Sequence, residues 1–161
     1  MVDHQRILQN IERCSDPEKL RTWITNLRNA GANEIAEAAF RRLVFLLPKE
    51  KPGTVEHDFW QMIHAFEHVL SEENGKTTRL SRTRQKVDRV GEVQTLKDWA
   101  LNTENTRGFN MLLERNMAEL TGEAIVLRHA DSFPNEVIVG ARSRLEAAGV
   151  DVGALPRRSE I

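Results

Sequence analysis

Residues 54–73 read TVEHDFWQMIHAFEHVLSEE, and this stretch decides the predicted fold. Thr54 is a typical helix N-cap, the acids that follow it suit a first helical turn, and Asn74-Gly75 is typical of a helix end. With a turn of about 100° per residue, the apolar side chains of the stretch fall in one arc. We predict that this arc faces the core; its members are Val55, Phe59, Met62, Ile63, Phe66, Val69 and Leu70.

Helical patterns continue on both sides of this stretch, whereas the alternation and Asn-Gly turns typical of a sheet are nearly absent. We therefore predict an all-α fold, an irregular multi-helix bundle of about eight or nine helices, several of them short. The expected helices cover residues 3–13, 15–29, 33–47, 54–73, 78–90, 95–102, 108–116, 121–129 and 132–148. Ser15 and Asn33 are the expected caps of the second and third helices.

The prolines and glycine of residues 48–53 form the clearest boundary in the chain, because proline cannot continue a helix. The prediction is an N-terminal helical region, residues 1–50, forming a hairpin or an arm. A main helical domain follows over residues 54–152, and residues 153–161 are expected to be a flexible tail. A single domain containing all three parts is the alternative.

The composition excludes several classes of protein. Of the 161 residues, 40% are hydrophobic and 29% are charged, a balance typical of a globular chain rather than a disordered one. The formal net charge of −1 argues against a surface that is basic throughout, so any binding of nucleic acid or anionic lipid must come from a local patch. Cys14 is the single cysteine and cannot form an internal disulfide. We expect a cytoplasmic protein with no leader, no membrane partner and no cofactor.

A basic segment at residues 76–89 is the local exception to this neutrality. It has six basic residues and one acid, Asp88, for a net charge of +5. On a helix, the apolar side of the segment would face the core and its guanidinium groups would point outward to match phosphate oxygens. The candidate nucleic-acid-binding residues are Lys76, Arg79, Arg82, Arg84, Lys86 and Arg89.

Three other interpretations of the basic segment remain open. The acids that precede it, Glu67, Glu72 and Glu73, are placed to fold back and neutralise it, or the segment is simply a solvated face. An acidic protein surface would also satisfy the same charges. The charges alone are therefore compatible with no partner, with a nucleic acid or with an acidic protein surface.

Residues 94–101 and 105–115 are candidates for the two helices of a helix-turn-helix. In that arrangement Asn105 and Arg107 would lie near the start of the recognition helix, where side chains reach base edges. The connection between the two helices lacks the glycine that is usual in the tight turn. We therefore keep Asn105 and Arg107 as candidate contacts to nucleic acid.

A histidine-rich stripe occurs at His57, His64 and His68. The residues from His64 to His68 spell H-x-x-E-H, a pattern that resembles the zinc-binding motif of inverted zincin peptidases, with Glu67 as the residue that would activate water. That resemblance implies two histidine ligands and a third ligand from elsewhere, for which no residue stands out. The helical projection places the stripe opposite the apolar arc, so we expect these histidines to face water or another subunit.

The leading hypothesis is thus a small nucleic-acid-binding or regulatory protein that uses the basic segment and the helix-turn-helix. A helical interaction or adaptor module that forms a homodimer is the alternative. A metal-dependent hydrolase with the H-x-x-E-H site is the third hypothesis, and no other catalytic signature is present.

Overall fold

A computed structural model describes residues 3–102 and 106–157 of the chain. Over these residues the secondary structure is helical, with nine α-helices, three short 3-10 helices and no strand, which confirms the predicted all-α class. The chain divides into two units, Met1–Lys49 and Glu50–Ile161. No helix in the described ranges combines the length and the apolarity needed to cross a bilayer.

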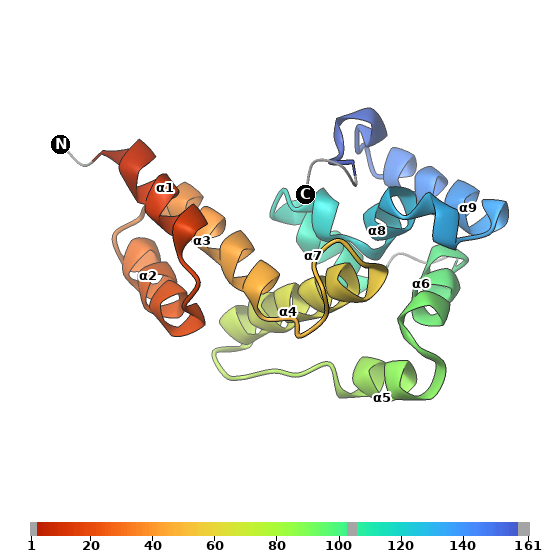
Figure 1. Cartoon of the computed structure of the whole chain (residues 1–161), viewed down its shortest axis with the longest axis horizontal. Helices are drawn as coiled ribbons and strands as arrows, with labels where there is room; N and C mark the ends of the chain where they lie inside the picture. Colours follow the sequence, from red (N-terminus) through yellow and green to blue (C-terminus); the bar gives the residue numbers. More distant parts are fainter. Residues whose placement is uncertain (1–2, 103–105, 158–161) are drawn as a thin grey trace. The chain divides into compact units, whose positions relative to one another are not determined.

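The first unit is a three-helix unit of α1 (His4–Arg13), α2 (Pro17–Asn29) and α3 (Asn33–Leu46), in which α3 packs on both α1 and α2 (Figure 1). Asp3 caps α1 through the backbone N–H of Arg6 at 3.2 Å. Asp16, not the predicted Ser15, caps α2, and its carboxylate accepts from the backbone N–H of Glu18 at 3.0 Å. The buried side chains between the helices are Ile11, Leu20, Ile24, Ile35, Ala36, Ala39, Phe40, Leu43 and Val44.

The second unit is organised around its longest helix, α4 (Val55–Asn74). The remaining helices of the unit are α5 (Ser81–Val90), α6 (Glu92–Ala100), α7 (Arg107–Glu114), α8 (Gly122–Arg128) and α9 (Asn135–Ala147). Three short 3-10 helices complete it: η1 (Ala118–Leu120), η2 (Ala130–Ser132) and η3 (Val152–Ala154). α4 packs on α6, α7, α8 and η1, and α8 also packs on α6 and α9 (Figure 1).

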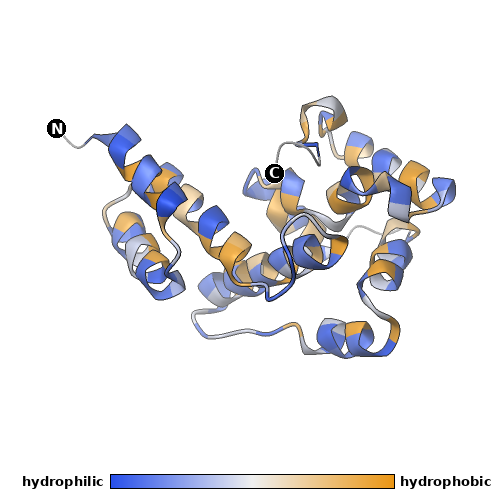
Figure 2. Cartoon of the chain, viewed as in Figure 1, coloured by the Kyte–Doolittle hydropathy of each residue, from blue (hydrophilic) through white to orange (hydrophobic). Residues whose placement is uncertain are grey.

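The predicted apolar arc of α4 is confirmed as the centre of this unit. All of its members are buried except Leu70, which is half-buried. The helices that pack on α4 carry both hydrophobic and hydrophilic residues (Figure 2), as expected for helices with one face in the core. Their buried side chains include Leu96, Phe109, Leu112, Met117, Ile125, Ala141 and Leu145.

The ends of α4 form as the sequence predicts. The hydroxyl of Thr54 accepts from the backbone N–H of His57 at 3.1 Å, and Gly75 ends the helix in the left-handed conformation with a φ of 69°. Glycine is favoured there because a side chain strains this backbone geometry. After Gly75 the chain runs as a loop through residues 76–80 before α5 begins (Figure 1).

Candidate functional site

The candidate site is the basic segment, now divided between the loop of residues 76–80 and α5. Lys76 and Arg79 lie in the loop and are exposed. Arg82 and Arg89 are exposed on α5, seven residues apart and therefore on one face of the helix. Arg84 and Lys86, by contrast, are half-buried. The six candidate cations therefore form two groups with different surroundings.

Arg84 belongs to the packing of the unit rather than to its free surface. Its Nε and Nη2 donate to the two carboxylate oxygens of Glu67 at 2.9 and 2.6 Å, in the bidentate geometry that arginine favours. Its guanidinium group also lies 5.2 Å from the ring centroid of Trp60. The prediction that Arg84 is presented to a partner therefore finds no support, because one edge of the guanidinium is bonded to Glu67 and one face lies over Trp60.

Glu67 also fixes the entry to α5. One of its carboxylate oxygens accepts from the backbone N–H of Leu80, the residue that precedes the helix, at 2.8 Å. Burial of Glu67 acts to raise its pKa, but the hydrogen bonds from Arg84 and Leu80 outweigh burial, and the pKa is lowered. The glutamate is therefore ionised at neutral pH and links α4 to both the loop and α5.

Lys86 is paired on the other side of α5. Its ammonium group lies 2.7 Å from a carboxylate oxygen of Asp98 on α6, and Gln94 donates to the second oxygen at 2.9 Å. The hydrogen bond from Lys86 is the main reason that the pKa of Asp98 is lowered. Like Arg84, Lys86 joins α5 to a neighbouring helix.

The other acids close to the loop also have partners. Glu72 lies 3.0 Å from Arg115 and 2.9 Å from His68. Glu73 lies 3.2 Å from Arg107, the candidate contact at the start of α7. The hypothesis that preceding acids neutralise the basic segment is thus partly right: Glu67 neutralises Arg84, whereas the two later acids pair with other residues.

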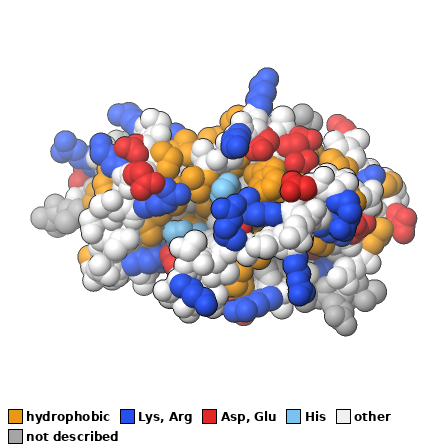
Figure 3. Space-filling view, turned by 90° about the horizontal axis from the view of Figure 1, so that it is seen from below, with side chains coloured by type: hydrophobic (Ala, Val, Ile, Leu, Met, Phe, Trp, Pro, Cys, Tyr) orange, Lys and Arg blue, Asp and Glu red, His pale blue; other side chains and the backbone are white. Residues whose placement is uncertain are grey.

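Four cations of the segment therefore remain exposed: Lys76, Arg79, Arg82 and Arg89. None of them forms an ion pair with any residue in the described part of the chain. Against the single exposed acid of the segment, Asp88, they leave a local charge of +3. Figure 3 looks from the side on which α5 lies and shows Lys and Arg side chains standing out from this face.

The helix-turn-helix hypothesis gains no support from the packing. α6 makes its main contacts with α4, α5, α8 and α9, whereas α7 packs on α4 and η1. The two helices thus pack on largely different partners instead of forming one hairpin. Arg107 is exposed in the first turn of α7, and Asn105 lies outside the described residues.

The histidine stripe is the clearest correction to the sequence analysis. His57 is buried, with 1% of its surface exposed, and His64 and His68 are half-buried rather than facing open solvent. Glu67 has both carboxylate oxygens occupied by Arg84 and Leu80, so it is not available to activate water. Within the described ranges no three His, Cys, Asp or Glu side chains are grouped so that they would hold a metal ion.

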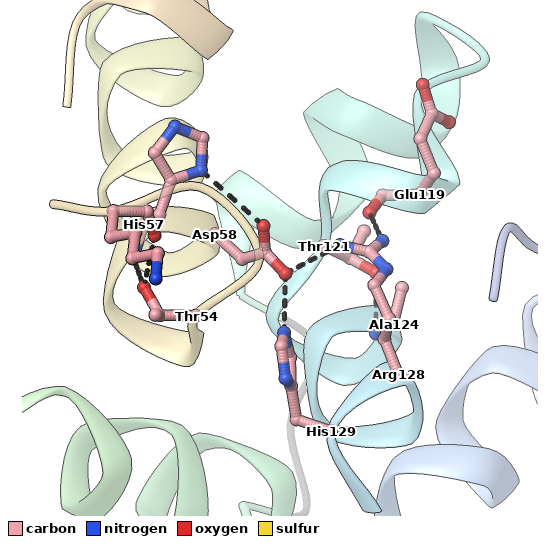
Figure 4. Close-up of polar contacts among 9 residues, drawn as sticks. Thr54, His57, Asp58, Glu119, Thr121, Ala124, Arg128 and His129 are labelled. Atoms are coloured by element: carbon pink, nitrogen blue, oxygen red, sulfur yellow. Dashed lines mark hydrogen bonds and ion pairs between the residues drawn. The ribbon is translucent and has the colours of Figure 1, made fainter. Parts of the chain in front are cut away.

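Sequence reasoning missed a buried polar cluster between α4 and α8 (Figure 4). Asp58 lies at its centre, 2.6 Å from Nε2 of His129 and 3.2 Å from Nη1 of Arg128. Because a carboxylate only accepts, Nε2 of His129 is the donor. Arg128 also donates to the backbone carbonyl of Glu119 at 2.6 Å. Burial opposes ionisation of Asp58, but His129 and Arg128 outweigh it and lower the pKa of Asp58.

The cluster pairs an aspartate with a histidine, as many hydrolases do, but its position does not suit catalysis. Asp58 and His129 are each 3% exposed, so a substrate has no access to the imidazole. The arrangement instead joins the start of α4 to the end of α8. A signal for it exists in the sequence, since Asp58 lies directly beside the apolar arc, but its partners lie seventy or more residues away.

Comparison of the chain with protein-family models, with curated proteins and with solved structures found no match.

Proposed function

We propose that the Glu50–Ile161 unit binds the phosphate backbone of a nucleic acid through four basic residues of the loop and α5: Lys76, Arg79, Arg82 and Arg89. We call these four residues the basic face. The observation that carries this proposal is that they stay exposed and form no ion pair in the described part of the chain, while Glu67, Asp98, Glu73 and Glu72 are paired with other residues.

The internal ion pairs support the proposal in a second way. Glu67 with Arg84 and Asp98 with Lys86 hold α5 from two sides. A basic helix held in this manner presents its free cations without first paying the full entropy of ordering itself. The pre-organised placement of Arg82 and Arg89 on one face therefore favours contact with a regular array of charges.

The residue types favour phosphate over an acidic protein surface. Three of the four cations are arginines, whose guanidinium groups match phosphate oxygens with two parallel hydrogen bonds. Thr77 and Ser81 are exposed between them and supply short hydroxyl donors of the kind that contact phosphates. Such contacts carry no base information, so we expect weak sequence preference.

The test is a binding titration with duplex DNA and with single-stranded RNA at several salt concentrations. With up to four phosphate contacts, a plot of the logarithm of the association constant against the logarithm of the salt concentration should have a slope of about −3 to −4 for duplex DNA. The double variant Arg82→Ala, Arg89→Ala should reduce this slope by about 2 and weaken binding for all sequences alike.

The matched control removes two exposed cations from the other unit, with Arg13→Ala and Lys19→Ala, so that the net charge changes equally. This control should bind nucleic acid as the wild type does. Equal weakening by the control and by the double variant would contradict the proposal, as would a complex that is insensitive to salt. Binding to an acidic peptide but to neither nucleic acid would replace it with the acidic-partner alternative.

A further inference from the structure

The second unit contains a pocket that the proposed function does not use. Its volume is about 290 Å³, and it lies among α4, the start of α5, α6, α7 and α8. Its walls are mainly apolar, with aromatic rings contributed by three helices: Phe66, Trp99 and Phe109. Thr106 and Arg107 also line it, and because both are exposed they mark where it reaches the surface.

Two glycines in the lining show that the surrounding helices are closely packed. A Cβ atom at Gly108 would lie 2.8 Å from the ring of Phe66, and one at Gly122 would lie 3.2 Å from Cδ2 of Leu96. The pocket is therefore not the result of loosely packed helices. An apolar hollow of this size within close-packed walls loses van der Waals contacts unless something fills it.

Glu123 supplies the buried polar group of the pocket. The residue is 5% exposed and lies in the first turn of α8. Nε of Arg144 donates to one of its carboxylate oxygens at 3.1 Å. Burial raises the pKa of Glu123, which Arg144 opposes only in part. Glu123 lines the mostly apolar pocket, and its carboxyl group keeps acceptor capacity beyond the hydrogen bond from Arg144.

We propose that this pocket binds a small neutral molecule with one aromatic ring and a hydroxyl or N–H group that donates a hydrogen bond to Glu123. The aromatic walls select the ring, since offset and edge-to-face contacts between rings add to simple burial. The volume restricts the ligand to the small end of the range for ligand pockets. A carboxylate on the ligand would meet the acidic side chain, so anions are disfavoured. This proposal stands independently of binding to nucleic acid.

The test uses three probes that share a ring and differ in one group: 4-methylphenol, toluene and 4-methylbenzoate. Each is titrated into the 161-residue chain and followed by amide chemical shifts in ¹H–¹⁵N spectra. We expect 4-methylphenol to bind at least threefold more tightly than toluene and to shift the amide signals of Gly108 and Gly122. We expect 4-methylbenzoate to bind at least tenfold more weakly than 4-methylphenol.

Two matched variants on α5 locate the binding. Thr83 lines the pocket, so Thr83→Phe should narrow it and weaken 4-methylphenol binding at least tenfold. Ser81 is exposed and lies two residues before Thr83, so its side chain points to a different side of α5, and Ser81→Phe should leave binding within twofold of the wild type. Should Thr83→Phe fail to fold, the order of the three probes in the wild type still decides the matter.

Three results would overturn the proposal. The first is the absence of saturable binding by 4-methylphenol at millimolar concentration. The second is 4-methylbenzoate binding as tightly as 4-methylphenol, which would remove the role of Glu123. The third is a folded Thr83→Phe variant with unchanged affinity, which would place the ligand elsewhere.

Discussion

Asp58 is a buried carboxylate that accepts hydrogen bonds from two side chains at once. Arg128 and His129 both point to the same oxygen, and Asp58 and Arg128 have side chains that are 2% and 6% exposed. The change Asp58→Asn keeps the shape but leaves Arg128 buried without its counter-charge. We expect the free energy of unfolding to fall by about 3 kcal/mol, measured by urea denaturation monitored by circular dichroism.

The control for this variant is Asp88→Asn, because Asp88 is exposed on α5. That change should alter the free energy of unfolding by no more than about 0.5 kcal/mol. An Asp58→Asn variant as stable as the control would mean that the cluster contributes nothing to the fold.

Acid should destabilise the protein by protonating two of its buried carboxylates, Asp58 and Glu67. The pKa of Asp58 and that of Glu67 are lowered from their ordinary values of 3.8 and 4.5. A carboxyl group with a lowered pKa in the folded state stabilises the protein above its ordinary pKa, and this stabilisation is lost as the pH falls through the folded value. We expect the free energy of unfolding to decline below about pH 4.5. The decline should be shallower in Asp58→Asn, and a variant with an unchanged slope would contradict this assignment.

At the scale of the element, the start of α5 shows where sequence reasoning fails. The sequence predicts that this helix begins at residue 78, whereas it begins at Ser81. The backbone N–H of Thr78 donates to Oγ of Ser71 at 2.8 Å, and that of Leu80 donates to Glu67. Hydrogen bonds from the loop backbone to side chains of α4 thus override the local helix signals of residues 78–80. The acceptors are too distant in sequence for a local pattern to reveal them.

The presence of the helices and the apolar arc of α4, in contrast, can be predicted from the sequence because they depend on local caps and periodicity. Thr54, Gly75 and Thr121 all end or begin helices where predicted. The candidate site can be predicted from the sequence only in part. Charge counts identify the basic segment, but they do not reveal that Arg84 pairs with a glutamate seventeen residues earlier.

The attachment of α5 can be tested with Glu67→Gln. This variant retains an acceptor for Leu80 but loses the ion pair with Arg84, whose side chain is 24% exposed. We expect a loss of about 2 kcal/mol in the free energy of unfolding, since hydrogen bonds to charged groups contribute more than neutral ones. We also expect faster hydrogen exchange of the backbone amides of α5, measured by NMR.

The matched change for comparison is Glu73→Gln, because Glu73 is 48% exposed and pairs with an arginine that is 69% exposed. Pairs at such exposure contribute little, so this variant should keep the wild-type exchange rates in α5. Equal exchange in the two variants would show that Glu67 does not hold the helix.

At the scale of the whole molecule, the chain forms two units with separate sets of packed helices. The core of the Glu50–Ile161 unit is built on the arc of α4 and on side chains from α6, α7, α8 and α9. A fragment of residues 50–161 should therefore unfold in one cooperative transition. Calorimetry of the fragment beside the full chain would measure this, and a broad transition without a heat-capacity peak would contradict it.

Trp60 gives α5 a built-in optical reporter. Its indole ring lies beneath the guanidinium of Arg84, and its Nε1 donates to Glu92 at 3.2 Å. Replacing Trp23 and Trp99 by phenylalanine would leave one fluorophore, whose emission should shift to longer wavelength whenever α5 separates from α4. Movement of the helix on encountering a polyanion would then be followed in real time, with no dye attached to either molecule.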